Sequence, residues 1–164
     1  MQVDGGSAPR NLVLLAARER GHWYHARRLM NAYADSLELD LSFQNFEHEL
    51  DYLESEYASP SGAFILAVED GQFVGCAGLR RFDEGAGEFK RLYLVPHARG
   101  RGIGRELAEA VVDAARKIGY ERLLLDTLPS MTVAQSLYLS LGFKPVDAYR
   151  FNPVAGTTFL ELKL

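Results

Sequence analysis

The stretch EFKRLYLVPHARGRGIGRELAEA, residues 88–110, decides how the rest of the chain is interpreted. It begins with the pattern of a short apolar strand, passes through a loop in which glycine and arginine alternate, and continues at once as an amphipathic helix. The loop combines very little side chain with much positive charge. Its residues are Arg99, Gly100, Arg101, Gly102, Ile103, Gly104 and Arg105.

A loop of this kind in front of a helix is suited to bind a phosphate or pyrophosphate. The first turn of a helix presents unpaired backbone N–H groups and the positive end of the helix dipole. Glycine lets an anion approach the backbone, and arginine adds charge-assisted hydrogen bonds. Three glycines so close together are also typical of a flexible turn, so the loop alone leaves both interpretations open.

Two common phosphate motifs do not fit this loop. The P-loop needs Lys followed by Ser or Thr after its last glycine, and no such pair stands here. The dinucleotide motif G-x-G-x-x-G fails because its last position is Arg105 when counted from Gly100, and Leu107 when counted from Gly102. The pattern that does fit is Arg99-x-x-Gly102-x-Gly104.

Upstream of the loop, the hydrophobic period predicts two helices followed by an antiparallel meander. Ser42 is placed to cap the second helix, whose apolar stripe is Phe43, Phe46, Leu50 and Leu53. The pair Asp70-Gly71 favours a tight hairpin. The expected elements are a strand at 11–18, helices at 21–38 and 42–57, and strands at 63–69, 72–81 and 88–95.

Downstream of the loop, the pattern predicts a helix at 103–118 that Gly119 ends. The strand after it, 121–127, follows a strand–helix pair and therefore runs parallel to 88–95. A helix at 131–142 and strands at 143–151 and 157–164 complete the order β-α-α-β-β-β-α-β-α-β-β. This predicts an α+β, three-layer fold with a mixed, mostly antiparallel sheet between helices, forming one domain over 11–164 behind a disordered lead at 1–10.

Composition narrows the class of protein. The net charge of −4 argues against nonspecific nucleic-acid binding, which needs a basic face. Cys76, the one cysteine, is expected to be a buried thiol, and neither a disulfide framework nor a metal site is expected. His22 and His25 are interpreted as surface or packing residues. The start of the chain lacks the apolar core of a signal peptide, and the expectation is a cytoplasmic protein without membrane contact.

Two segments together resemble the Gcn5-related N-acetyltransferase (GNAT) family. Residues 88–110 are similar to its strand–loop–helix motif, whose Q/R-x-x-G-x-G/A loop binds the pyrophosphate of acetyl-CoA. AQSLYLSLGF, residues 134–143, is similar to its later A-x-x-L-Y-x-x-x-G-F segment. The resemblance extends from residue 11 to the end of the chain and implies the acyl-CoA N-acyltransferase fold, with acetyl-CoA as cosubstrate and no metal.

The resemblance also implies roles in cofactor binding. In the family, the strand before the loop separates from the parallel strand after the helix, and the pantetheine arm pairs with the exposed backbone. By position Leu92, Tyr93 and Leu94 would make these contacts, and the Leu94 N–H would polarise the thioester carbonyl. The seven residues Arg99–Arg105 would surround the pyrophosphate. Met131 stands where the family often has an asparagine that contacts the CoA arm, which leaves that contact in question.

Two residues match the positions that move protons in the family. Glu88 would deprotonate the attacking amine, directly or through water, and its alternative is a glutamate at a strand start that faces solvent. Tyr138 would protonate the thiolate leaving group, and its alternative is a core aromatic residue. We therefore expect an acetyl-CoA-dependent N-acetyltransferase that acts on a primary amine, most simply on a small molecule.

Three alternatives stay open at this stage: a protein or peptide acceptor, a non-catalytic acyl-CoA sensor of the same fold, and a different nucleotide-binding domain. Acidic and aromatic residues of the first two helices would suit a cationic amine, although such a run is also an ordinary solvated face. A homodimer is an open expectation, because dimers are common in the family. The acidic and aromatic residues are Tyr33, Asp35, Glu38, Asp40, Phe43, Phe46 and Glu47.

Overall fold

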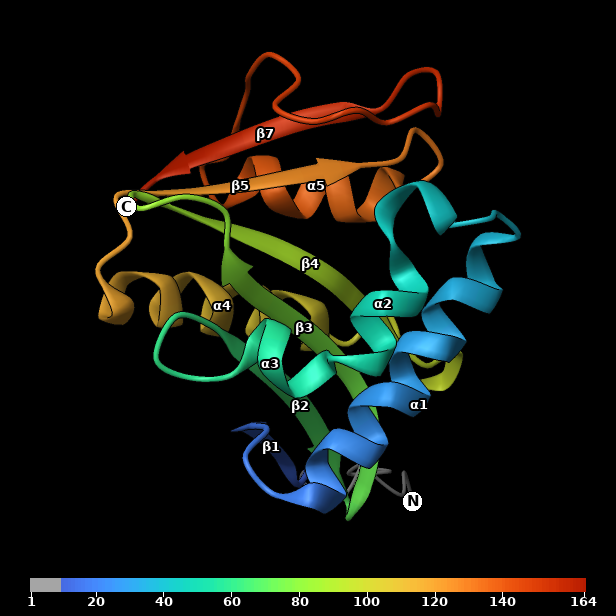
Figure 1. Cartoon of the computed structure of the whole chain (residues 1–164). Helices are drawn as coiled ribbons and strands as arrows, with labels where there is room; N and C mark the ends of the chain where they lie inside the picture. Colours follow the sequence, from blue (N-terminus) through green and yellow to red (C-terminus); the bar gives the residue numbers. More distant parts are fainter. Residues whose placement is uncertain (1–9) are drawn as a thin grey trace, which may run out of the picture.

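The computed structural model describes residues 10–164 (Figure 1), so most of the predicted lead, residues 1–9, lies outside the described residues. Arg10 donates hydrogen bonds to the Arg101 carbonyl and to Glu106, each at 2.8 Å. The elements are β1 (Leu12–Ala16), α1 (Arg20–Leu37), η1 (Ser42–Gln44), α2 (Phe46–Asp51), α3 (Leu53–Tyr57), β2 (Ala63–Glu69), β3 (Gln72–Arg81), β4 (Ala86–Leu94), η2 (Pro96–Ala98), α4 (Ile103–Ile118), β5 (Arg122–Thr127), α5 (Thr132–Ser140), β6 (Lys144–Pro145) and β7 (Thr158–Lys163).

Seven strands form one mixed sheet in the order β1-β2-β3-β4-β5-β7-β6. Every neighbouring pair is antiparallel except β4 and β5, which are parallel as predicted. Figure 1 shows α1, α2 and α3 on one face of the sheet and α4 and α5 on the other. Each face has its own hydrophobic core, built around Phe64 and Leu66 on the first and around Leu107 and Val111 on the second. The predicted three-layer α+β architecture is confirmed.

Helix α4 occupies the predicted range because its sequence gives one consistent pattern. Ile103, Leu107 and Val111 lie one helical turn apart and are completely buried against the sheet. Gly119 ends the helix with a φ of +102°, a left-handed conformation that glycine adopts without a steric penalty. The helix therefore holds its N-terminus, and the glycine loop in front of it, at a defined edge of the sheet.

Strands β4 and β5 separate along their length. They pair only from Ala86 to Glu88 on β4, opposite Arg122 to Leu124 on β5, although both strands continue beyond these residues. In Figure 1 they lie side by side at one end and diverge toward the other. The cause lies in β4, where the pairing with β3 shifts register next to Arg91, whose φ is +62°. A bulge of this kind bends a strand away from its neighbour.

The predicted second helix, 42–57, is instead three short pieces. Asn45 adopts a left-handed φ of +56° between η1 and α2. Tyr52 is a non-helical residue that separates α2 from α3. Ser42 does not cap a helix. It is the first residue of η1, and its N–H donates to Asp40. The side chain of Phe43 is not among those that the structure describes. Phe46, Leu50 and Leu53 of the predicted apolar stripe are nevertheless all buried in the core.

The predicted strand at 143–151 is also wrong in extent. Its ordered part, β6, covers only Lys144–Pro145, and residues 146–157 form a loop before β7. Pro145 lacks the N–H that a longer ladder needs. Tyr149 and Arg150 of this loop instead turn back over β4. Among the described residues, no helix has the length and apolarity that a membrane crossing requires.

Candidate functional site

The glycine loop has the backbone geometry of an anion site. Gly100 and Gly102 have φ values of +76° and +84°, which side-chain-bearing residues rarely adopt. Gly102 is the N-cap of α4. Within residues 10–164, the N–H groups from Gly100 to Arg105 donate to no backbone carbonyl. These N–H groups converge at the positive end of the α4 dipole, where a phosphate would be stabilised.

The arginines of this loop are already held by neighbouring groups. Arg101 forms an ion pair with Glu69 at 2.7 Å, and Arg105 donates to the Ser140 hydroxyl at 2.6 Å. Both are well exposed, so each interaction contributes little stability by itself. Their arrangement indicates that these side chains support the shape of the loop, while the backbone supplies the uncommitted donors.

The backbone of β4 faces the opening as predicted at Leu94. Val95 donates to the Val74 carbonyl at 2.9 Å, so its neighbour Leu94 directs its own N–H and C=O away from β3. In agreement, the Leu94 carbonyl accepts a hydrogen bond from Arg99 Nε at 3.0 Å. Tyr93 lies opposite Cys76 in the β3–β4 register, so its backbone groups face β3 and not the opening.

A cavity of about 40 Å³ passes through the sheet where β4 and β5 separate. Side chains from both faces line it, because α1 and η1 reach it from one side and α5 from the other. A larger hollow of about 550 Å³ lies beside β1, but none of the predicted site residues lines it, so we assign the chemistry to the smaller one. Its lining includes Tyr33, Lys90, Leu92, Asp126, Tyr138 and Asn152.

Tyr138 lies on α5 at this cavity and is 6% exposed. Its ring packs edge-on against Phe89 at 5.5 Å between centroids and lies 5.8 Å from Phe143. Burial raises the pKa of its hydroxyl well above the ordinary 10, and nearby Tyr33 and Asp126 add to this effect. The hydroxyl therefore stays protonated at neutral pH. Tyr138 is therefore a core aromatic residue that also lines the cavity, with a hydroxyl that is protonated at neutral pH.

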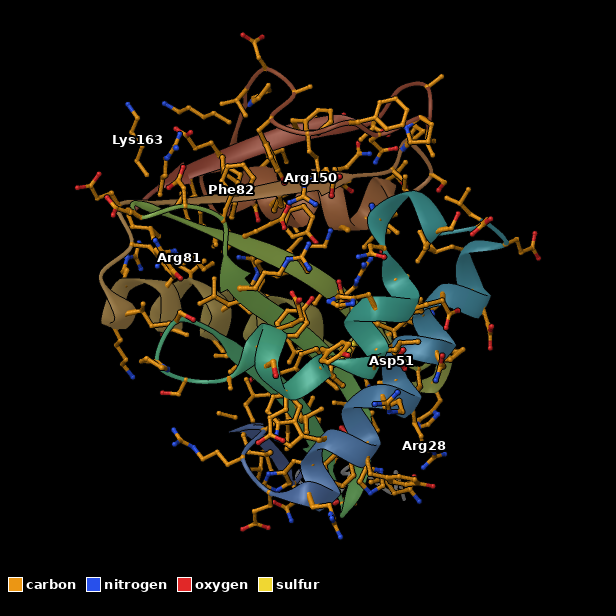
Figure 2. All side chains as sticks on the ribbon, viewed as in Figure 1. Arg28, Asp51, Arg81, Phe82, Arg150 and Lys163 are labelled. Atoms are coloured by element: carbon orange, nitrogen blue, oxygen red, sulfur yellow. The ribbon has the colours of Figure 1, made fainter. Side chains whose placement is uncertain are left out.

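Glu88 is buried and does not face solvent, since its exposed fraction is 1%. It is the last residue of β4 that pairs with β5, so it stands where the strands begin to separate. Its carboxylate accepts hydrogen bonds from Arg80 at 3.1 Å, Tyr149 at 2.9 Å and Arg150 at 2.9 Å. Figure 2 labels Arg150 beside Phe82, and its guanidinium lies 5.8 Å from the centroid of that ring. Glu88 does not line the cavity itself.

Lys90 and Arg91 also reach the cavity, although we did not predict them as site residues. The signal in the sequence is a pair of charged residues in the middle of a strand that is otherwise apolar and central. Arg91 forms a buried ion pair with Glu49 at 2.8 Å, and Arg80 contacts the same carboxylate at 3.1 Å. Lys90 is 4% exposed, and its ammonium has no hydrogen-bond partner among the described residues.

Replacing Arg91 by leucine is expected to lower the free energy of unfolding by about 2 kcal/mol. Removing one member of a buried pair usually costs ~3–5 kcal/mol, and Arg80 offsets part of this loss because it still contacts Glu49. Urea unfolding at pH 7 measures the difference, with the double variant Glu49→Leu/Arg91→Leu as the control that removes both charges. Equal midpoints for wild type and Arg91→Leu would contradict the prediction.

The ion pair between Glu49 and Arg91 also predicts how the loss of stability in Arg91→Leu depends on pH. Burial by itself raises the pKa of Glu49, but Arg91 and Arg80 outweigh it and leave the pKa below the ordinary 4.5. The stabilisation is therefore present above about pH 4.5 and is lost as pH falls through the lowered pKa. We expect the stabilities of wild type and Arg91→Leu to converge in acid.

Comparison with known proteins agrees with this geometry. A model of the acetyltransferase (GNAT) family matches residues 26–143. The chain belongs to this family. It is 31% identical over 158 residues to an uncharacterized N-acetyltransferase of Schizosaccharomyces pombe, covering 95% of this chain and 97% of that protein. It is 32% identical over 149 residues to the N-acetylaspartate synthetase of Danio rerio, covering 89% of this chain and 48% of that protein.

The fold of this acetyltransferase is also found among solved structures. A GNAT family acetyltransferase from Elizabethkingia anophelis, solved with acetyl-CoA bound, superposes with a TM-score of 0.64 at 20% identity. The superposition covers 94% of this chain and 99% of that one. The predicted order of strands and helices is therefore that of the family.

The structure also places the remaining candidate residues of this acetyltransferase, most of which do not line the cavity. Asp35, Glu38, Asp40 and Glu47, predicted to suit a cationic amine, are exposed and do not line it. Cys76 is buried as expected, and burial raises the pKa of its thiol to about 12. His22 accepts hydrogen bonds from the backbone N–H groups of Arg18 and Glu19, His25 stacks on Phe73 at 3.9 Å, and Met131 lines the cavity.

Proposed function

We propose that this acetyltransferase binds acetyl-CoA and transfers its acetyl group to the primary amine of a small molecule. The observation that carries the proposal is the cavity between β4 and β5, which is lined by side chains from both faces of the sheet. Acetyl-CoA, which is bound in the Elizabethkingia structure, would enter from the side of the loop and α5. The amine would enter from the side of α1 and the loop 146–157.

The described residues divide the chemistry between the two faces. The N–H groups of Gly100–Arg105 hold the pyrophosphate, and the backbone of Leu92 and Leu94 pairs with the pantetheine arm. The Leu94 N–H donates to the thioester oxygen, whose negative charge grows in the tetrahedral intermediate. This placement brings the thioester carbon to the cavity, where the amine attacks it directly.

Proton transfer completes the reaction. The amine must lose its proton before attack, and we assign that proton to Glu88 through an intervening water, because the carboxylate does not line the cavity. When the C–S bond breaks, the leaving thiolate takes the hydroxyl proton of Tyr138. The second proton of the attacking nitrogen is lost to solvent, and solvent returns one proton to Tyr138. The products are the acetylated amine and CoA, with one proton released.

Thermal unfolding with acetyl-CoA, CoA, ATP and NAD tests the cofactor assignment. A ligand at a hundred times its Kd adds about 2.7 kcal/mol of stability, or about 5–10 °C in Tm for a domain of this size. We expect shifts with acetyl-CoA and CoA and none with ATP or NAD. Equal shifts with ATP would contradict the proposal, and a shift without thioester consumption across a panel of amines would identify a non-catalytic acyl-CoA sensor.

A further inference from the structure

Lys90 presents a charge that the proposed transfer reaction does not use. Its side chain is 4% exposed, lines the cavity, and carries an ammonium without a hydrogen-bond partner among residues 10–164. An ammonium has three donors, and burying it unpaired is costly. A cation kept in this position is suited to meet an anion that arrives with a ligand.

The two arginines and the two glutamates beside Lys90 on this face of the sheet are already paired. Arg91 pairs with Glu49, and Arg80 contacts both Glu49 and Glu88. Arg150 pairs with Glu88 from the loop 146–157. Asp126, across the opening, accepts a hydrogen bond from Asn152 at 3.3 Å. Lys90 therefore stands beside satisfied ion pairs, and the carboxylates of Glu88 and Asp126 accept hydrogen bonds from donors other than Lys90.

We propose that the Lys90 ammonium binds a carboxylate of the acceptor, so that the acceptor is a small amino acid and not a cationic amine such as a polyamine. The inference rests on the proposed acetyl transfer and names its substrate class. Lys90 projects from β4 at the cavity that Tyr138 closes from the opposite face. A carboxylate held at Lys90 leaves an amine a few bonds away free to point through the opening toward the thioester.

The environment of Lys90 adds a pH dependence to this recognition. Burial lowers the pKa of Lys90 to about 8, against the opposing attraction of Glu88 and Asp126, and the cations Arg91 and Arg80 lower it further. The hydroxyls of Tyr33 and Tyr138 line the same cavity and stay neutral, because their pKa values are raised by burial. The ammonium thus binds a carboxylate below about pH 8 and loses this ability above it.

The sequence alone left a cationic acceptor open as one interpretation of the acidic residues Asp35, Glu38, Asp40 and Glu47. These four residues are exposed and do not line the cavity, as an ordinary solvated face would be. Of the charged side chains that do line it, Lys90 and Arg91 are cationic and Asp126 is anionic. A cationic acceptor would have to place its charge beside an unpaired ammonium, which like-charge repulsion opposes.

The test compares acceptors that differ only in the carboxylate. The wild-type chain is assayed for thioester consumption with the common L-amino acids, and the best of them is then compared with its carboxamide, which has nearly the same shape without the charge. We expect the amide to have a KM at least tenfold higher. In Lys90→Met the KM for the amino acid rises at least tenfold, whereas the KM for the amide is unchanged, and Lys90→Arg restores part of the difference.

The outcomes separate this inference from the proposed function. A chain that shows the acetyl-CoA thermal shift but acetylates only amines without a carboxylate overturns the acceptor class alone. A chain that shows the shift and acetylates no amine at all is a non-catalytic sensor, which removes the transfer reaction on which the inference rests. A loss of kcat in Lys90→Met at unchanged KM would mean that Lys90 serves in proton transfer, and would also overturn it. Absence of the acetyl-CoA shift removes the proposed function itself.

Unfolding experiments supply a readout that needs no substrate. Because the pKa of Lys90 is lower in the folded chain than the ordinary 10.5, the unfolded chain binds more protons between about pH 8 and 10.5, and this group makes stability rise with pH there. In Lys90→Met this rise disappears, and the Tm at pH 7 is equal to or above that of wild type. A lower Tm for Lys90→Met would show that Lys90 serves the fold and would contradict the inference.

Discussion

Replacing Tyr138 by phenylalanine is expected to lower kcat about 100- to 10,000-fold, the range that general acid catalysis typically contributes. The substitution removes only the hydroxyl group. Without its proton, the CoA thiolate leaves unprotonated. The packing of the ring against Phe89 and Phe143 is retained, so the fold should persist. Steady-state kinetics with a saturating acceptor measures the loss, and the KM for acetyl-CoA should change little.

The control for Tyr138 is Tyr120, another buried tyrosine that packs in the same core. Its hydroxyl donates to the Ser61 carbonyl at 2.6 Å, away from the cavity, so Tyr120→Phe removes an equivalent atom without touching the reaction. We expect Tyr120→Phe to cost about 1 kcal/mol of stability and no activity at a temperature where it is folded. Wild-type turnover in Tyr138→Phe would leave Tyr138 as a core residue only.

Replacing Glu88 by glutamine is expected to lower kcat/KM at neutral pH by about 100-fold or more, since the amine then lacks its base. Glutamine keeps the shape of the side chain and one acceptor oxygen, although its amide nitrogen faces cationic donors from Arg80 and Arg150. Binding of acetyl-CoA, followed by the thermal shift, should be almost unaffected. The pH profile is the decisive measurement, because the limb at low pH that reports the base should vanish.

The variant Tyr149→Phe distinguishes a base from an anchor. It removes one of the three donors to Glu88 and weakens the contact of the loop 146–157 with β4, but it leaves the carboxylate in place. If Glu88 acts as the base, Tyr149→Phe keeps the acidic limb of the profile that Glu88→Gln loses. Similar losses in both variants, with an unchanged profile, would assign Glu88 to holding the loop.

Local sequence patterns determined most of the architecture. Helix α4, the β2–β3 hairpin and the parallel placement of β5 follow from hydrophobic period, from the turn pair Asp70-Gly71 and from the handedness of strand–helix–strand connections. The errors fall at 42–57 and 143–157, where the chain follows the curved face of the sheet. There, regular elements are interrupted at Asn45 and Pro145. The hydrophobic periodicity of the sequence does not predict these interruptions.

Part of the candidate site could likewise be predicted from local sequence, and part could not. The glycine loop could be predicted because a spacing of glycines before a helix has a local physical meaning, the exposure of N–H groups to an anion. Tyr138 and Glu88 came from a resemblance, and the structure adds where they stand: one at the cavity wall, the other in an ion-pair network beside it.

The sequence by itself determined the family, the order of elements and the position of the anion-binding loop, since each depends on residues that are close together in the chain. Only the tertiary structure decided the charge of the cavity between β4 and β5. That charge depends on which partner each side chain meets: Arg91 meets Glu49 from α2, Glu88 meets Arg150 from the last loop, and Lys90 meets none among the described residues. These pairs join residues that are 42 and 62 positions apart in the sequence, so tertiary packing determines them. The composition of the chain does not predict them.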